Sequence, residues 1–271
     1  MANFDLQKIL EAWMLATGDE KLDFDKVQIR RDSQEWINIT DTVETPFYSI
    51  KFNEDGSIAQ IYDKELSRNW IKENFNKLHI YHDYPGVYDA WDILPDYAEK
   101  EDNFNVTSPL TLTFSNGETA EFTTILSTEK STWKMIIRLF RQSRAIEVEN
   151  IVDWNEKHRL AKIEFAPDIL TRELLCDTSA GFIKREMHKN ASWQQAKYET
   201  CHHKWFDMSE TDAGIAVINN GKYGVGIGDK NVTLSLLRAT ERPDPTSDIG
   251  HHEFTYMILP HAGNAYDAKI N

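Results

Sequence analysis

Residues 106–126 read VTSPLTLTFSNGETAEFTTIL, and this stretch decides the fold class. Two runs rich in apolar and β-branched residues, 106–114 and 119–126, flank the tetrapeptide Ser115-Asn116-Gly117-Glu118. Asn-Gly between two such runs is the strongest short-range sequence signal for a β-hairpin. The stretch therefore predicts two antiparallel strands that are joined by a tight connection.

The same pattern of short apolar runs separated by turn residues extends along the chain from Phe47 onward. Residues 146–154 alternate between apolar and mostly charged positions, which is the period of a strand with one buried face. The loop 53–56 ends in a glycine that can adopt positive φ. Other expected strands cover residues 47–52, 58–62, 215–218, 223–227, 232–237 and 254–259. About a dozen strands predict an all-β fold, a large antiparallel β-sandwich.

The beginning of the chain has a different period. Apolar residues at helical spacing form one stripe over residues 4–17, and Gly18 follows as a stop signal. The stripe consists of Leu6, Ile9, Leu10, Trp13 and Met14. We therefore expect an N-terminal helix and a charged connecting segment over residues 1–43, followed by a β-sandwich domain over residues 44–271.

Composition excludes several classes of partner. The chain has 44 acidic and 30 basic residues, and its formal charge of -14 repels nucleic acid and anionic lipid surfaces. The N-terminus lacks a basic region followed by a long apolar run, and no later run reaches membrane-spanning length. We expect a soluble, cytoplasmic protein without a membrane or nucleic-acid partner, in which Cys176 and Cys201 are reduced thiols.

The motifs of several catalytic classes do not fit this sequence. No Gly-x-Ser-x-Gly nucleophile elbow is present, and Gly224-Val225-Gly226-Ile227-Gly228 leads into a strand instead of a phosphate-binding helix. Three histidine pairs resemble metal ligands, but neighbours on a flat strand, or residues three apart, point to opposite faces. These pairs are His79 with His82, His202 with His203, and His251 with His252. We expect no metal site in this chain.

Two polar segments are candidates for a sugar site. Asp89 and Asp92 lie in the aromatic stretch 84–93, but in an extended chain they would be about 10 Å apart on opposite faces. A retaining glycosidase needs a carboxylate pair about 5–5.5 Å apart, so a self-contained catalytic pair is disfavoured. The stretch fits a sugar-facing loop or a core plug equally well. The loop 238–248, stiffened by two prolines, fits a ligand rim or an ordinary strand connection.

Several ordered motifs resemble glycoside hydrolase family 38, in particular bacterial α-mannosidases of the lysosomal-type branch. They are Tyr88-Asp89-Ala90-Trp91-Asp92-Ile93, His188-Lys189-Asn190-Ala191-Ser192-Trp193, Ala196-Lys197-Tyr198-Glu199, His203-Lys204-Trp205, Leu234-Ser235-Leu236-Leu237-Arg238, Pro243-Asp244-Pro245-Thr246 and His252-Glu253-Phe254-Thr255-Tyr256. The resemblance covers about residues 44–263 and corresponds to the C-terminal β-sandwich region of these enzymes, which is similar to galactose mutarotase.

The resemblance implies a retaining α-mannosidase of carbohydrate catabolism. In this family an N-terminal barrel supplies the nucleophilic aspartate and most ligands of one zinc ion, and a helical bundle follows it. Those parts do not match this sequence, so the resemblance implies no catalytic residue, cofactor or metal here and no activity of this chain alone. The sandwich would pack against the barrel and bind α-mannosides at the pocket; homo-oligomer formation stays open.

By motif, the resemblance assigns substrate binding to five residues, with roles in hydroxyl recognition and transition-state electrostatics. They are Tyr88, Asp89, Asp92, Arg238 and Asp244. A purely structural role of the Tyr-Asp-Ala-Trp-Asp motif stays open. Two alternative functions also remain: a carbohydrate-binding module without catalysis, and a mutarotase-like aldose epimerase, which needs a histidine and a carboxylate facing one sugar.

Overall fold

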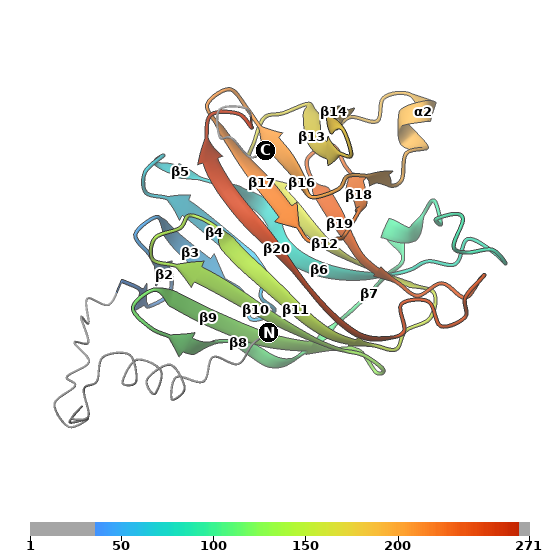
Figure 1. The fold of residues 1–271 in the computed structure, drawn as a ribbon, viewed down its shortest axis with the longest axis horizontal. Helices are drawn as coiled ribbons and strands as arrows, with labels where there is room; N and C mark the ends of the chain where they lie inside the picture. Colours follow the sequence, from blue (N-terminus) through green and yellow to red (C-terminus); the bar gives the residue numbers. More distant parts are fainter. Residues whose placement is uncertain (1–35, 266–271) are drawn as a thin grey trace, which may run out of the picture. The chain divides into compact units, whose positions relative to one another are not determined.

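The computed structural model describes residues 36–265, and these residues form 20 strands, one short α-helix and one 3-10 turn (Figure 1). The prediction of an all-β antiparallel sandwich is confirmed. The helix predicted over residues 4–17 lies outside the described residues. None of the described helices is long and apolar enough to cross a membrane.

The largest layer is a nine-stranded antiparallel sheet. Its strands, in spatial order, are β14 (Gly181–Glu186), β13 (Glu173–Thr178), β16 (Trp205–Ser209), β17 (Ala213–Asn219), β20 (Gly250–Ala262), β11 (Ile146–Trp154), β10 (Thr132–Phe140), β9 (Thr119–Ser127) and β8 (Asn105–Ser115). The long central strand β20 pairs with β11 on one side and β17 on the other. Figure 1 shows β20, β11 and β10 running side by side across the molecule.

Two smaller sheets complete the sandwich. The six-stranded sheet has the order β15 (Thr200–Cys201), β18 (Gly224–Ile227), β19 (Val232–Arg238), β12 (Arg159–Pro167), β6 (Ile71–His82) and β7 (Glu101–Asp102). The five-stranded sheet has the order β1 (Asn38–Ile39), β2 (Val43–Glu44), β3 (Tyr48–Phe52), β4 (Ile58–Asp63) and β5 (Arg68–Asn69). Strand β1 precedes residue 44, the start of the predicted sandwich domain, and pairs with β2.

The hairpin at 106–126 forms as predicted, with Ser115 opposite Ala120. The side chain of Asn116 closes the turn, because its Oδ1 accepts hydrogen bonds from the backbone N–H groups of Glu118 and Thr119 at 2.8 and 2.7 Å. In the other predicted hairpin, β3–β4, Gly56 has φ +83°, as expected for that loop. A Cβ at Gly56 would lie 2.9 Å from Met135 Sδ, so packing also favours glycine there.

Aromatic side chains join the six-stranded and nine-stranded sheets. The ring of Phe165 on β12 packs edge-on against Phe206 on β16 and Tyr256 on β20, with centroids 6.1 and 5.9 Å apart. The Tyr256 hydroxyl donates to Asn76 Oδ1 on β6 at 2.5 Å, so this buried polar group also crosses the layers. Because successive side chains alternate along a strand, the neighbours of Phe165 on β12 face the opposite side of the sheet. That opposite face carries the candidate site.

One sequence expectation needs correction. About a dozen strands were expected, whereas the described residues form 20, five of which are only two residues long. The segment 219–222 joins β17 to β18, which belong to different sheets and do not pair with each other. This turn carries the chain between layers, because β17 pairs with β16 and β20 while β18 pairs with β15 and β19.

Candidate functional site

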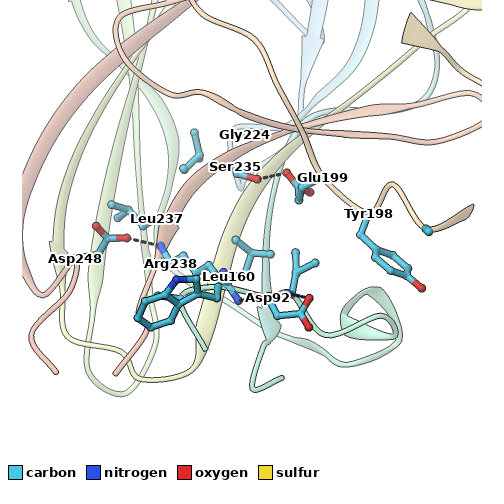
Figure 2. Close-up of a pocket in the computed structure, with 14 residues that line it drawn as sticks. Asp92, Leu160, Tyr198, Glu199, Gly224, Ser235, Leu237, Arg238 and Asp248 are labelled. Atoms are coloured by element: carbon cyan, nitrogen blue, oxygen red, sulfur yellow. Dashed lines mark hydrogen bonds between the residues drawn. The ribbon is translucent and has the colours of Figure 1, made fainter. Parts of the chain in front are cut away.

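A pocket of about 450 Å³ lies over the six-stranded sheet. Its floor comes from β12, β18 and β19, and its walls come from residues 90–93, residues 196–199 and Asp248 (Figure 2). The pocket combines apolar groups such as Leu160 and Trp91 with the carboxylates of Asp92, Glu199 and Asp248. Such a mixture of apolar surface and a few polar groups is typical of a small-molecule site.

Arg238, at the end of β19, holds one wall of this pocket. Its Nε pairs with Oδ2 of the buried Asp83 at 2.5 Å, and its Nη2 donates to the backbone carbonyl of Asp92. Asp83 also accepts a hydrogen bond from Leu94 N at 2.9 Å, while Asp248 Oδ2 accepts one from Arg238 N at 2.7 Å. Arg238 therefore fixes the backbone around Asp92.

Asp89 holds the same loop from the other side. Its carboxylate is 1% exposed and accepts backbone hydrogen bonds from Glu241 N at 2.8 Å and Arg242 N at 2.9 Å. Burial opposes ionisation of Asp89, but the two backbone donors outweigh it and lower its pKa. Asp89 does not line the pocket, and its carboxylate ties the loop 83–94 to the loop 239–248.

The residues around Asp89 point outward. Tyr88 and Trp91 are each 69% exposed, and their rings meet edge-on with centroids 5.7 Å apart. Asp92 is exposed as well, and its Oδ1 accepts a hydrogen bond from Ile93 N at 2.9 Å. The buried Asp89 thus anchors a turn that presents an aromatic pair and a carboxylate to solvent.

Asp244 lies in the second loop, away from the pocket lining. Its exposed carboxylate accepts hydrogen bonds from Thr246 N at 2.9 Å and Thr246 Oγ1 at 2.8 Å, so it caps its own turn. Of the five residues assigned by motif, the structure brings two, Asp92 and Arg238, together at the pocket. Tyr88, Asp89 and Asp244 do not line it.

An ionic cluster that reaches the pocket through Glu199 was missed by sequence reasoning. Lys162 on β12 is fully buried and pairs with Glu199. Glu199 Oε2 accepts a hydrogen bond from Ser235 Oγ at 2.8 Å (Figure 2). The hydroxyl of Tyr97 donates to Glu199 Oε1 at 3.4 Å. Burial lowers the pKa of Lys162, and the charge of Glu199 opposes this shift. The sequence feature that could have indicated this cluster is Lys162 itself, a charged residue within the apolar run of β12.

Two glycines of β18 make room for this cluster. A Cβ at Gly226 would lie 2.8 Å from Glu199 Oε1 and 2.9 Å from Lys162 Nζ. A Cβ at Gly224 would lie 2.9 Å from Ser235 Cβ. Gly224 and Gly226 belong to β18, which pairs with β19, and Gly228 follows this strand. The absence of a side chain at Gly224 and Gly226 leaves space for buried side chains.

The histidine pairs do not converge on a common ligand. His79 on β6 contacts Glu101 at 2.6 Å and Glu164 at 3.0 Å, whereas its pair partner His82 is exposed. Burial opposes protonation of His79, but the two carboxylates outweigh it and raise its pKa. Across residues 36–265, no group of three His, Cys, Asp or Glu side chains is arranged to hold a metal ion.

We expect Asp89→Asn to lower the free energy of unfolding at pH 7 by about 1.5–3 kcal/mol, because backbone donors lose a charged acceptor. The folded-state pKa of Asp89 is lowered, so its contribution is present above its ordinary value and disappears as pH falls through the folded value. The difference between the variant and the parent should therefore shrink on acidification. Urea unfolding of the variant and the parent at several pH values measures this difference.

The matched control for this prediction is Asp244→Asn. The exposed Asp244 caps only its own turn, and an asparagine oxygen can accept the same backbone hydrogen bond. Because Asp244 is fully exposed and solvent screens its interactions, the stability of this variant should change much less than that of Asp89→Asn, although the lowered pKa of Asp244 gives any loss the same direction of pH dependence. Equal effects of the two substitutions at pH 7 would contradict the role of Asp89 as the tether.

Gly226→Ala should lower the free energy of unfolding by about 1–3 kcal/mol, because the new methyl group would overpack against Thr233 Oγ1, at 2.6 Å, and against the Lys162–Glu199 pair. Gly117→Ala is the control, since a Cβ there meets no heavy atom within 4 Å. Urea denaturation of both variants measures the difference. Similar stabilities would show that β18 can accommodate side chains facing the cluster.

Comparisons with known proteins agree with this architecture. Residues 43–246 match the model of the glycosyl hydrolases family 38 C-terminal domain. The chain is 29% identical over 243 residues to Alpha-mannosidase 2C1 of Mus musculus and 32% identical over 244 residues to Alpha-mannosidase G of Dictyostelium discoideum. Each match covers 84% of this chain but 22% of the relative, so the chain spans about a fifth of their length.

Among solved structures, an α-mannosidase from Enterococcus faecalis V583 is similar in fold, with a TM-score of 0.69 and 13% sequence identity. The match covers 86% of this chain and 31% of that one. The family resemblance indicated by the sequence motifs is confirmed, because the family model covers most of the chain. The chain belongs to glycosyl hydrolase family 38, and residues 43–246 correspond to its C-terminal domain.

Proposed function

We propose that this chain is the C-terminal domain of a retaining α-mannosidase and contributes the rim of its mannoside-binding pocket. The catalytic nucleophile and a zinc ion would come from a barrel domain outside this chain. One observation carries the proposal: the turn that exposes Trp91 and Asp92 is held from beneath by the buried Asp89 and by Arg238.

The exposed groups on this turn suit a sugar. The flat ring of Trp91 offers apolar surface to the C–H face of a pyranose, and its edge-on contact with Tyr88 supports the ring. The carboxylate of Asp92 can accept hydrogen bonds from sugar hydroxyls, which are stronger when the acceptor is charged. Because the backbone is fixed at both ends of the turn, little further ordering is required on binding.

The assignment of roles follows from what each carboxylate already contacts. Asp89 is occupied by two backbone donors, so it positions the turn and does not touch the substrate. Retaining hydrolysis needs a nucleophile and an acid about 5–5.5 Å apart. The other two carboxylates at the pocket already have partners, because Glu199 pairs with Lys162 and Asp248 accepts a hydrogen bond from Arg238 N. Asp92 is therefore assigned to hydroxyl recognition, and Arg238 to holding the Asp92 backbone in place.

The described part of the chain offers no fitting zinc site, because no three suitable ligands are grouped there. As the family resemblance implies, zinc would be held by the barrel, where it would supply Lewis-acid chemistry. The residues described here would bind and orient the sugar and exclude water from one side. The epimerase alternative gains no support at this pocket, since none of its described lining residues is a histidine.

The test uses an enzyme that contains this chain together with a family 38 barrel. Trp91→Ala and Asp92→Asn should each lower kcat/KM for an aryl α-mannoside at least about tenfold, as expected for a lost sugar contact worth about 1.4 kcal/mol. Stability should be unaffected, because both side chains are exposed. Steady-state kinetics and thermal unfolding provide the two measurements.

Matched controls are Tyr62→Ala and Asp41→Asn, which alter an exposed aromatic ring and an exposed carboxylate outside the pocket. Both controls should retain the parent kcat/KM. Unchanged kinetics in the Trp91 and Asp92 variants would overturn the proposal. Mannose binding by the 271-residue chain, combined with unchanged kinetics of the longer enzyme, would favour a carbohydrate-binding module instead.

A further inference from the structure

A second pocket, of about 370 Å³, has a charge opposite to that of the whole protein. It lies between β14, the short helix α2 (Ser192–Gln195) and the adjoining segment 188–200. Its basic lining residues are Lys184, Arg185, His188, Lys189 and Lys197. Four Lys or Arg residues face two glutamates, Glu173 and Glu186, which leaves an excess of two positive charges in a chain of net charge -14.

Both glutamates already have partners. Glu173 Oε2 pairs with Lys184 Nζ at 2.7 Å, and Glu186 Oε2 accepts a hydrogen bond from the Gln194 amide at 2.6 Å. Within residues 36–265, Lys189, Lys197 and Arg185 form no ion pair. These three cations are available to a negatively charged ligand.

Arg185 also has a donor without a partner. Its Nη2 donates to the backbone carbonyl of Cys201 at 2.7 Å, which orients the guanidinium. Its Nε–H is buried and has no hydrogen-bond acceptor among the described residues, while the guanidinium as a whole also interacts with the buried thiol of Cys176. A buried unsatisfied donor costs free energy, and an anion that accepted its hydrogen bond would remove that cost.

Gln194 fixes the shape of the pocket. This side chain is 7% exposed, and its Oε1 accepts hydrogen bonds from the backbone N–H groups of Asn190 and Ala191, both at 2.9 Å. Its Nε2 donates to Glu186, as described above, and lies 3.2 Å from His188 Nε2. The segment that carries Lys189 and Lys197 is therefore anchored from within, and the basic groups are held near one another before any ligand binds.

Trp193 lies at the edge of the same pocket. Its ring is 55% exposed, and Lys197 Nζ lies 4.6 Å from the ring centroid. A cation beside an exposed aromatic ring fits a ligand that joins an anionic group to a flat or sugar-like body. The motif His188 to Trp193 was recognised in the sequence, but the mannoside pocket uses none of its residues.

We infer that this basic pocket binds a phosphoryl group, either as free phosphate or on a small sugar phosphate. A phosphate carries about 1.5–2 negative charges at pH 7, which matches the excess of two positive charges. Its oxygens can accept hydrogen bonds from lysine ammonium and arginine guanidinium groups together. The site goes beyond the mannoside pocket, with which it shares no lining residue.

The test is isothermal titration calorimetry of the 271-residue chain with inorganic phosphate, glucose 6-phosphate and glucose. We expect at least one of the two phosphates to bind with a Kd of about 1 mM or tighter, and glucose alone not to bind in this range. The double variant Lys189→Gln/Lys197→Gln should weaken phosphate binding at least about tenfold, because two charged donors are lost. Circular dichroism checks that the variant folds.

The matched control is Lys51→Gln/Lys130→Gln, which removes two exposed lysines outside this pocket and should leave the Kd unchanged. Tighter binding of glucose 6-phosphate that is reduced by Trp193→Ala would support a sugar phosphate as the ligand, and equal affinity would support free phosphate. The inference is overturned if neither phosphate binds with a Kd of about 1 mM or tighter, or if both double variants weaken binding equally.

Discussion

The candidate site depends on one buried carboxylate. Asp89 accepts hydrogen bonds from the backbone of Glu241 and Arg242, which lie 152 and 153 residues further along the chain. A buried charge is tolerated only when it is paired or hydrogen-bonded, and these two bonds, together with His158 Nδ1 at 3.2 Å from Asp89 Oδ2, compensate the burial of this carboxylate. Arg238 and Asp83 form a second link between the same loops. With the backbone fixed at two points, the exposed side chains between them are presented in one geometry.

Strand β12 of the six-stranded sheet also combines a core side chain with a side chain of the candidate site. On β12, Phe165 faces the nine-stranded sheet and joins the core, whereas Lys162 faces the opposite side and meets Glu199. Removing either partner of such a pair would leave a buried or partly buried charge without compensation, which is more costly than the pair is stabilising. Gly226 provides the necessary space. The pocket floor is therefore held by electrostatics and packing together.

Local features of this fold could be predicted because their causes are local. Asn116 closes its hairpin with hydrogen bonds to residues two and three positions away, and the alternation over residues 146–154 matches the alternation of buried and less buried side chains along β11. The route of residues 219–222 could not be predicted in the same way. A turn sequence does not reveal whether the next strand pairs with the previous one or joins another sheet, since that depends on distant partners.

The same limit applies to the site. The sequence placed Asp89 and Asp92 together in a polar aromatic loop, but it could not show that backbone donors from residues 241 and 242 occupy only Asp89. Lys162 appeared only as an interruption of an apolar run, because its partner Glu199 lies 37 residues away. Residue type and spacing thus identified the loop, whereas the role of each side chain follows from contacts across the fold.

Amide hydrogen exchange at Glu241 and Arg242 tests the central claim most directly. If Asp89 holds these two N–H groups, they should exchange at least about a hundredfold more slowly than in an unstructured peptide, and Asp89→Ala should abolish this protection selectively. Amides in the centre of β11 should keep their protection in the variant. Rapid exchange of both amides in the parent protein, or unchanged protection in the variant, would contradict the account.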